Sequence, residues 1–452
     1  MKSARFTPPA LIRVTAAFAL AGVLAPAALA PVATVARGAT PDPLDSLRSA
    51  PALDLALLTR AVLARNASLG ALRAAHAAAE ARADQAGALM DPMLEGMVAP
   101  RSLGSDVVDP AWGLSFSQHL APFGQGGLLR RAARADGRAA LENVRAMRLD
   151  LAREASRLYF HMYEIARAEA VTDDLRTLVD QFRRVALQKY AAGTVGQSDA
   201  LQAEVEIAML DHERAVLVRE RRMTAARLKA LLHDESPAPF PDPPADLPPA
   251  PSPEEAIAPA ADASVDALPS VRALAASRDA RDQERRLAKR ARLPELTVTA
   301  SYDRFMEEVE WRPIVGVGVN LPIWQGRLRA REREAQAMVE RADLERSAAR
   351  DAARAELTEA RARVEETAHE VHILESGVLP ASERSLASAR AAYESNRGDF
   401  LALLSAERDL SRARLSLHRA EASYRMALAD LDWARGAEPP SPAEEPGQEG
   451  SR

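Results

Sequence analysis

The sequence predicts a mainly α-helical protein with a small β part, built from a helix–strand–strand–helix–helix unit that occurs twice. Charged residues make up 27% of the 452 residues and aromatic residues only 4%, a mix typical of long helices and coiled coils. Short sequence blocks recur in the same order about two hundred residues apart. Each copy also contains two short strand candidates, and in three of the four, at about 112–120, 296–302 and 314–321, apolar and small polar residues alternate as they do in β-strands. The candidate at about 93–99 is the weakest, because Glu95 and Gly96 interrupt it.

The repeat is visible in two pairs of blocks. The block PFGQG at 122–126 recurs as PIWQG at 322–326, an offset of 200 residues. The block at 190–204, which starts with tyrosine and ends in LQAE, recurs at 393–407, where it ends in LSAE. The near-equal offsets and the common order predict a duplicated structural unit.

The first thirty residues have the pattern of a secretory signal peptide. A basic start is followed by the apolar segment 14–30, which ends in Ala28-Leu29-Ala30. A membrane anchor helix is the alternative, but Gly22 and Pro26 interrupt the segment, and it is short for a membrane span. Residues 31–50, rich in Pro and Ala, are predicted to form a flexible lead-in.

The first repeat is predicted to cover residues 51–235. A helix is expected from about residue 53 to 89, and strands at about 93–99 and 112–120. A long helix follows from about 128 to 192, which at about 1.5 Å per residue would reach roughly 100 Å. After a turn, a second helix is expected from about 199 to 232, with Ser198 or Asp199 as its N-cap.

A proline-dense segment, residues 236–270, is predicted to connect the two repeats as a semi-rigid linker that is not part of a core. The second repeat, residues 271–436, is expected to hold a helix at about 271–292 and strands at about 296–302 and 314–321. A helix from about 327 to 378 should break at Pro380. Another helix leads to a turn at 396–398, a last one ends near Trp433, and residues 437–452 form a disordered tail.

The predicted strands are amphipathic in the manner of transmembrane β-strands. In the strand at 314–321 valine and leucine occupy one face, and Gly316, Gly318 and Asn320 occupy the other. An apolar face suits lipid, and a small polar face suits a water-filled lumen. Two ordinary hairpins packed on helices are the alternative. Four strands cannot close a barrel, and open sheet edges are not tolerated in lipid. The membrane interpretation therefore requires several chains to share one barrel.

These blocks, in this order and twice over, resemble the TolC family of outer-membrane efflux proteins. The resemblance covers about residues 50–436. It implies a homotrimer in which a twelve-stranded transmembrane β-barrel in the outer membrane is continuous with a coiled-coil α-helical tunnel through the periplasm. It further implies a passive exit duct for small molecules or metal ions. The implied partners are outer-membrane lipid, a periplasmic adaptor (membrane fusion) protein and an inner-membrane pump, expected to be of the resistance-nodulation-division type.

The resemblance also implies two groups of site residues. The periplasmic helix tips, where adaptor docking and gating are expected, comprise Tyr190, Gly193, Thr194, Val195, Gly196, Ser198, Asp199, Tyr393, Asn396, Arg397, Gly398 and Asp399. The aromatic residues expected at the membrane interfaces are Trp112, Phe116, Phe123, Tyr302, Trp311 and Trp324.

The sequence departs from the family pattern at the second tip. Asn396 stands in place of the expected glycine, although asparagine also tolerates left-handed geometry. Ala402 and Ser405 occupy positions where some relatives carry tunnel-narrowing aspartates, which leaves Asp399 as a possible substitute. The chain has no cysteine, and so it lacks both disulfides and the lipidated cysteine of some relatives.

No enzyme signature is present: the sequence shows no catalytic constellation, no phosphate-binding loop and no cofactor motif. His369 and His372 are close enough on one helix to consider a metal, but two ligands on a solvated helix do not make a site, and no metal or cofactor is predicted. The net charge of −5 gives no reason to invoke nucleic acid. The main alternative function is a secreted or periplasmic coiled-coil structural or interaction protein, which would leave the amphipathic strands without a purpose.

Overall fold

The computed structural model describes residues 42–98, 112–193, 195–258, 265–303, 313–395 and 397–437. The chain divides into two units, Met1–Pro41 and Asp42–Arg452, and all the described residues lie in the second. The predicted signal peptide, most of the lead-in and most of the tail lie outside the described residues.

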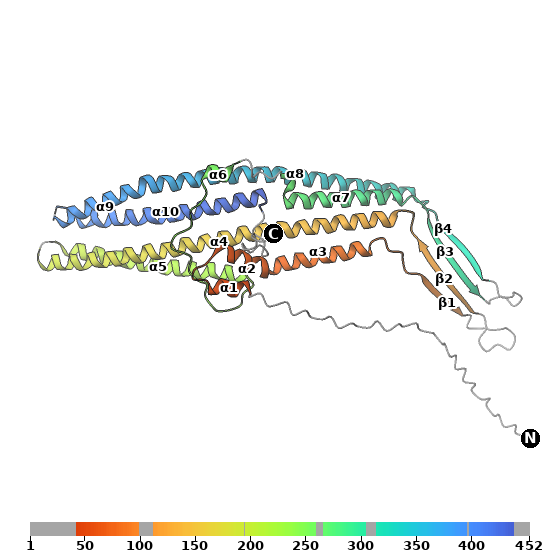
Figure 1. Cartoon of the computed structure of the whole chain (residues 1–452), viewed down its shortest axis with the longest axis horizontal. Helices are drawn as coiled ribbons and strands as arrows, with labels where there is room; N and C mark the ends of the chain where they lie inside the picture. The colour runs from red at the N-terminus through yellow and green to blue at the C-terminus, as the bar shows by residue number, and fades with distance from the viewer. Residues whose placement is uncertain are drawn as a thin grey trace, which may run out of the picture. The chain divides into compact units, whose positions relative to one another are not determined.

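The helix–strand–strand–helix–helix order occurs twice, as the duplicated blocks predict (Figure 1). The first copy consists of α3 (Ala67–Gln85), β1 (Met93–Val98), β2 (Trp112–Leu120), α4 (Gln125–Ala191) and α5 (Gln197–Leu231). The second consists of α7 (Pro269–Arg290), β3 (Glu295–Asp303), β4 (Ile314–Asn320), α8 (Gln325–Ile373) with its continuation α9 (Leu379–Glu394), and α10 (Phe400–Arg435). Additional short helices are α1 (Pro43–Ser49), α2 (Leu55–Arg65), α6 (Pro253–Ile257) and the 3₁₀ turn Val265–Ala267.

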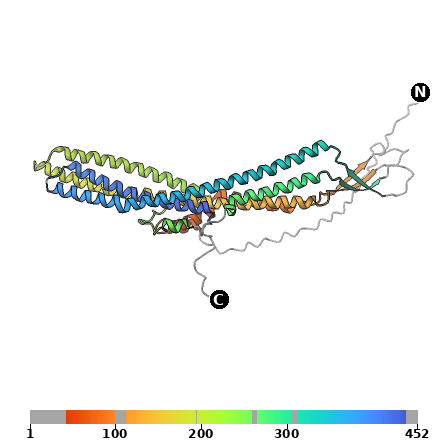
Figure 2. The same cartoon turned by 90° about the horizontal axis from the view of Figure 1, so that it is seen from above.

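Helix α4 lies at the centre of the bundle and contacts α3, α5, α7 and α10, whereas α8 contacts α7 and α10 (Figures 1 and 2). The strands join α3 to α4 and α7 to α8, and they lie at one end of the helices. The α4–α5 and α9–α10 turns lie at the other end (Figure 1).

The four strands form one antiparallel sheet in the order β1-β2-β3-β4. The two predicted hairpins therefore pair with each other through β2 and β3, for example Ser117 opposite Thr299. The outer edges of β1 and β4 pair with no described strand.

The first predicted helix is two helices, and the prediction of one helix over residues 53–89 is wrong at Asn66. Asn66 ends α2 and caps α3, because its side-chain oxygen accepts from the Leu69 amide at 3.1 Å. Its side-chain amide also donates to the carbonyl of Leu231 at 3.0 Å. A short polar side chain that satisfies the free amides of a first turn starts a new helix at that point.

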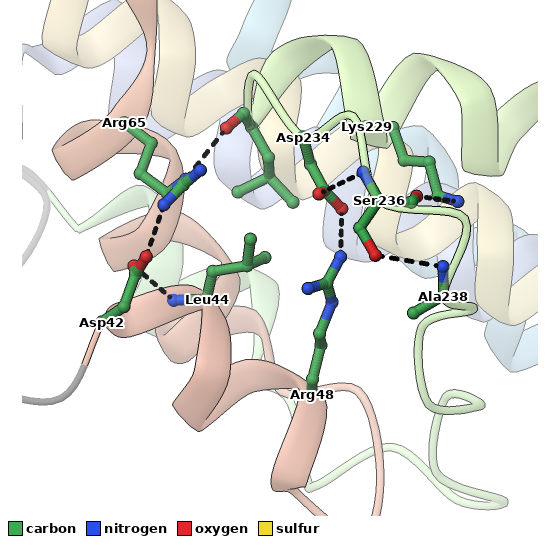
Figure 3. Close-up of polar contacts among 9 residues, drawn as sticks. Asp42, Leu44, Arg48, Arg65, Lys229, Asp234, Ser236 and Ala238 are labelled. Atoms are coloured by element: carbon green, nitrogen blue, oxygen red, sulfur yellow. Dashed lines mark hydrogen bonds and ion pairs between the residues drawn. The ribbon is translucent and has the colours of Figure 1, made fainter.

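Residues 43–49 of the predicted lead-in form α1 instead of a flexible segment. Asp42 caps this helix through the Leu44 amide, and Leu44 and Leu47 are buried in the main core. Figure 3 shows how α1 is tied to the end of α5: Arg48 donates to Asp234 at 2.6 Å, and Arg65 bridges Asp42 and the carbonyl of Leu232. These contacts come from residues far apart in sequence, which a local composition argument does not include.

The break expected at Pro380 lies a few residues earlier, as a single π-helical turn at Leu374–Val378, and Pro380 itself is helical in the first turn of α9. Proline lacks an amide hydrogen and crowds the preceding turn, and one widened turn accommodates it without ending the helix.

The proline-rich segment after α5 packs on the main core, so the prediction that it takes no part in a core is wrong. Phe240 and Leu247 are partly buried against a cluster that includes Leu58, Tyr163 and Leu228. The hydroxyl of Tyr424 donates to the carbonyl of Pro251 at 2.7 Å. Proline stiffens the segment, while its few large apolar side chains still bury surface on the helices it crosses.

Among the described residues, no single helix is both long and apolar enough to cross a membrane. Only α2 and α3 taken together meet that test, and they are bent by 47° at Asn66.

Candidate functional site

The α4–α5 turn is the first of the two predicted tips. Gly193 has a φ of 73°, a left-handed conformation that suits glycine, and its amide bonds to the carbonyl of Tyr190 at 2.9 Å. The predicted N-cap is wrong: α5 begins at Gln197, and Gly196 holds the cap position in extended conformation. Ser198 and Asp199 are already in the first turn, where Ser198 Oγ donates to Asp199 Oδ1 at 3.3 Å. Val195 is described and half-buried, whereas Thr194 lies outside the described residues.

The α9–α10 turn is closed by backbone bonds and by one glycine. The amides of Arg397 and Gly398 both bond to the carbonyl of Ala392, at 2.9 and 3.0 Å. A Cβ atom on Gly398 would lie 2.9 Å from the Cβ of Ala392 and 3.0 Å from the backbone nitrogen of Tyr393. Glycine is therefore needed here for the close approach. Asp399 occupies the cap position of α10 without a side-chain cap bond, and Asn396 lies outside the described residues.

The two tips meet at Tyr393. Lys189 of α4 donates to the carbonyl of Tyr393 at 3.3 Å, and its Nζ lies 4.1 Å from the centre of the tyrosine ring. The same ring packs edge-on against Phe400 at 5.8 Å. Tyr393 is only 7% exposed, and burial, together with the nearby charge of Asp199, raises the pKa of its phenol. Its counterpart Tyr190 is 47% exposed, so the repeat places two equivalent tyrosines in different environments.

A small core behind the tips joins the two helical hairpins. It contains apolar residues of α4, α5, α9 and α10: Leu175, Val179, Ala203, Leu210, Tyr393, Phe400, Leu403 and Leu404. Next to this core the buried carboxylate of Glu206 in α5 binds Arg408 of α10 through two bonds, one of them 2.7 Å long from Nε. A paired arginine and carboxylate between two hairpins orients one against the other.

Sequence reasoning missed Lys189, Glu206 and Arg408. No periodic pattern marks them, because Lys189 and Arg408 resemble the many other basic residues of the helices. Ala402 and Ser405, which stand where some relatives carry aspartates, both lie on the exposed face of α10. Glu407 is buried instead, and loss of hydration raises the pKa of its carboxyl above the usual 4.5.

The sheet places most of its apolar residues on one face, whereas Met93, Met97 and Ile314 lie on the opposite face. Directly paired residues share a face, and the register pairs Phe116 with Leu94 and Ala300, and Val298 with Val317. These apolar side chains are exposed, Val317 by 65%. The opposite face pairs Ser117 with Thr299, and Thr297 with Gly318. Gly316 and Gly318 make room for the threonines, since a Cβ on Gly316 would lie 2.7 Å from Thr299 Oγ1.

The predicted interface aromatics lie mainly toward the two ends of the strands. Trp112 and Tyr302 pack against each other, with ring centres 5.4 Å apart, at the end remote from the helices. Phe123 and Trp324, both exposed, lie where the strands pass into α4 and α8. Phe116 lies in the middle of β2, and Trp311 is outside the described residues.

The described part of the chain holds no group of three or more histidine, aspartate or glutamate side chains arranged to bind a metal ion. His369 and His372 are exposed on α8 and face the short helix α6 across a groove that also includes Glu365. The site that the structure assembles therefore consists of two helix tips at one end and an amphipathic sheet at the other.

Comparison with known proteins relates this arrangement to channels. Residues 264–437, which form the second repeat, match the family model described as outer membrane efflux protein. No curated protein sequence matches the chain significantly.

Solved structures share the fold at low sequence identity. The Campylobacter jejuni CmeC outer membrane channel is 15% identical with a TM-score of 0.72, and the match covers 84% of this chain and 85% of that one. The outer membrane protein VceC of Vibrio cholerae is 18% identical, with a TM-score of 0.69 and coverages of 84% and 96%. The Neisseria gonorrhoeae MtrE outer membrane channel is 20% identical with a TM-score of 0.69, and the match covers 84% of this chain and 88% of that one.

Proposed function

Because residues 264–437 match the outer membrane efflux protein family and the described chain has the fold of outer-membrane channels, we propose that this protein is the outer-membrane channel of a tripartite efflux pump. The matched family consists of channels and not of enzymes. The protein resides in the outer membrane, with its helical part in the periplasm.

The amphipathic sheet with two free edges carries the proposal. One face exposes valine, leucine and aromatic side chains. The other carries serine, threonine, glycine and carboxylate residues, with Met93, Met97 and Ile314 as its apolar members. In lipid every backbone amide and carbonyl needs a partner, and closure into a barrel is how a sheet meets that need. Since β1 and β4 run antiparallel to each other, the β4 edge of one copy can pair with the β1 edge of the next and continue the antiparallel pattern.

Three copies would close a barrel of twelve strands, in which the apolar face meets lipid and the polar face lines a water-filled lumen. The helices of the three copies would continue this lumen as a periplasmic tunnel. The exposed apolar side chains of α5 at Leu201, Val205 and Met209, spaced by four residues, provide surface for contacts between helices of neighbouring copies.

The helix tips are proposed as the place where a periplasmic adaptor docks and where the tunnel closes. The pair of Glu206 and Arg408, and the contact of Lys189 with Tyr393, hold the α9–α10 hairpin against α4 and α5 within one chain. An inner-membrane pump of the resistance-nodulation-division type would deliver the solute, and the duct itself would be passive.

The experiment that tests this function is membrane fractionation of cells that express the full chain, followed by detergent extraction and electrophoresis with and without heating. We expect an outer-membrane protein that runs as a trimer until it is heated, and a deletion strain with raised sensitivity to exported compounds. A protein that fractionates with soluble periplasmic proteins as a monomer would instead support the coiled-coil scaffold.

A further inference from the structure

The four strands differ in charge from the rest of the chain. They contain Glu95, Glu295 and Asp303 but no lysine or arginine over the residues that the structure assigns to them. The whole chain has 59 lysine and arginine residues among 452, most of them on helices. The described strands therefore carry no lysine or arginine on either face.

Glu95 and Glu295 both lie on the polar face of the sheet. Glu95 is paired directly with Ser115, which in turn pairs with Ser301. Glu295 lies on the same side of β3 as Ser301, because the two are separated by an even number of residues. Over the described residues, the polar face therefore carries hydroxyl residues, glycines and the carboxylates Glu95 and Glu295. It also carries uncharged larger side chains and one imidazole: Met93, Met97, Ile314, Asn320 and His119.

Glu295 is held at the end of the sheet nearest the helices. Its carboxylate lies 3.5 Å from His119 Nε2 and 3.5 Å from Asn320 Nδ2, so residues of β2 and β4 position it from both sides. His119 Nδ1 is in turn 3.3 Å from Thr297 Oγ1. These neighbours fix the direction of the carboxylate on the polar face.

At the helix end of the sheet, two described arginines bond to groups outside the strands. Arg290, at the end of α7, donates to the carbonyl of Phe123. Arg292, just before β3, pairs with Glu332 of α8. Arg290 and Arg292 therefore point to the loop and helix side of this junction.

We propose that the polar face of this sheet gives the duct a preference for cationic solutes over anionic ones, with Glu95 and Glu295 as the residues that set it. The proposal rests on the proposed function, since only a water-filled lumen shared by several copies brings these carboxylates around one path. Like charges that line a narrow passage with low-dielectric walls raise the local concentration of the opposite charge by about tenfold or more. Because the described strands contain no lysine or arginine, no such side chain on this face opposes the effect.

The absence of native cysteine allows a direct test. Ser117→Cys introduces a single thiol of similar size on the polar face, between the rows that contain Glu95 and Glu295. The purified trimer in lipid vesicles would be treated with methanethiosulfonate reagents of equal size that carry either a trimethylammonium or a sulfonate group. The thiolate forms a mixed disulfide and releases methanesulfinate, and mass spectrometry measures each rate relative to free mercaptoethanol.

We expect the cationic reagent to label Ser117→Cys roughly tenfold faster than the anionic one after this correction. Glu295→Gln or Glu95→Gln should lower the ratio, and the double substitution should bring it close to one. Glu340→Gln, a matched change on an exposed position of α8, should leave the ratio unchanged.

If Ser117→Cys with both glutamates intact reacts equally fast with the cationic and the anionic reagent, the inference is overturned. It is also overturned if the ratio of the two labelling rates stays the same when both glutamates are replaced. A second cysteine variant separates this failure from failure of the proposed function. Val317→Cys, on the apolar face, should resist both reagents because lipid covers it. If Ser117→Cys resists both reagents while Val317→Cys reacts, the polar face does not line a lumen, and both proposals fall.

Discussion

Burial distinguishes residues that the repeated sequence makes equivalent. Glu204 and Glu407 end the same four-residue block in the two copies, yet Glu204 is exposed and lies 3.8 Å from Arg183, whereas Glu407 is buried. Glu407 makes no described hydrogen bond or ion pair, and loss of hydration raises its pKa. A carboxyl that is more easily protonated in the folded state than in the unfolded one weakens folding once it must ionise.

We therefore expect Glu407→Gln to stabilise the protein at neutral and alkaline pH. The folded state binds the proton more tightly than the unfolded state does, so the stability of the native protein falls as the pH rises from about 4.5 through the raised pKa of Glu407. The gain in apparent Tm of Glu407→Gln should be largest near pH 8 and should vanish below about pH 4.5. Thermal unfolding followed by circular dichroism across this range measures it.

Glu204→Gln is the matched control, because it changes the same residue type at the equivalent position of the other repeat. It should alter the apparent Tm little, and by the same amount at every pH. A pH-independent effect of Glu407→Gln would contradict the role assigned to burial.

At the scale of single elements, the alternation of residue types determines which face of each strand is apolar. The register then aligns these faces across four strands, so that Val317, Val298 and Gln118 stand side by side. Gln118 is the polar exception on the apolar face, and its side chain donates to the carbonyl of Met90 at 2.8 Å instead of standing free. A continuous apolar surface arises only when both hairpins join.

Val317→Arg should prevent assembly in the outer membrane. A charged side chain near the middle of the lipid-facing surface of a barrel costs about 2–4 kcal/mol per copy. We expect a large loss of the heat-modifiable trimer in outer-membrane fractions, measured by quantitative immunoblotting. Ser347→Arg, which introduces the same side chain at an exposed position of α8, should assemble normally; equal trimer levels for both variants would contradict a lipid-facing role.

At the scale of the whole described chain, the proline-rich segment after α5 ties the two repeats together near the middle of the helices. Leu53 donates its amide to the carbonyl of Asp242 at 2.8 Å, and Arg425 of α10 binds the carbonyl of Pro248. Further on, Asp430 of α10 binds Arg153 and Arg157 of α4 at 2.6 and 2.9 Å. The main core thus combines α1, α2, α3, α4, α5, the linker and α10.

Phe240→Ala should therefore weaken the helical bundle although the residue lies in a segment of low complexity. Phe240 is partly buried against the main core, and its loss should cost roughly 1–2 kcal/mol, less than for a fully buried phenylalanine. Thermal unfolding in detergent should show a lower apparent Tm. Phe123→Ala, at a position that is 89% exposed, is the control and should leave the apparent Tm nearly unchanged.

Much of the architecture could be predicted because it depends on local patterns. Alternation located β2, β3 and β4 to within about a residue, and turn residues such as Gly193 and Gly398 located the tips. The failures have two causes. Helix α1 and the packing of Phe240 depend on residues distant in sequence, such as Asp234 and Leu228. The break at Asn66 is a local cap on the Leu69 amide that the helical pattern of the segment concealed.

The sequence by itself determined the duplication, the order of helices and strands, and the amphipathic character of each strand, because these properties repeat every two or every three to four residues along the chain. Only the tertiary structure decided that Tyr393 and Glu407 are buried while Tyr190 and Glu204 are exposed, and that Glu206 meets Arg408. It also brought Glu295 next to His119 on a face where the described strands have no lysine or arginine. Two copies of one pattern receive different neighbours when they fold, and neighbours determine burial and charge.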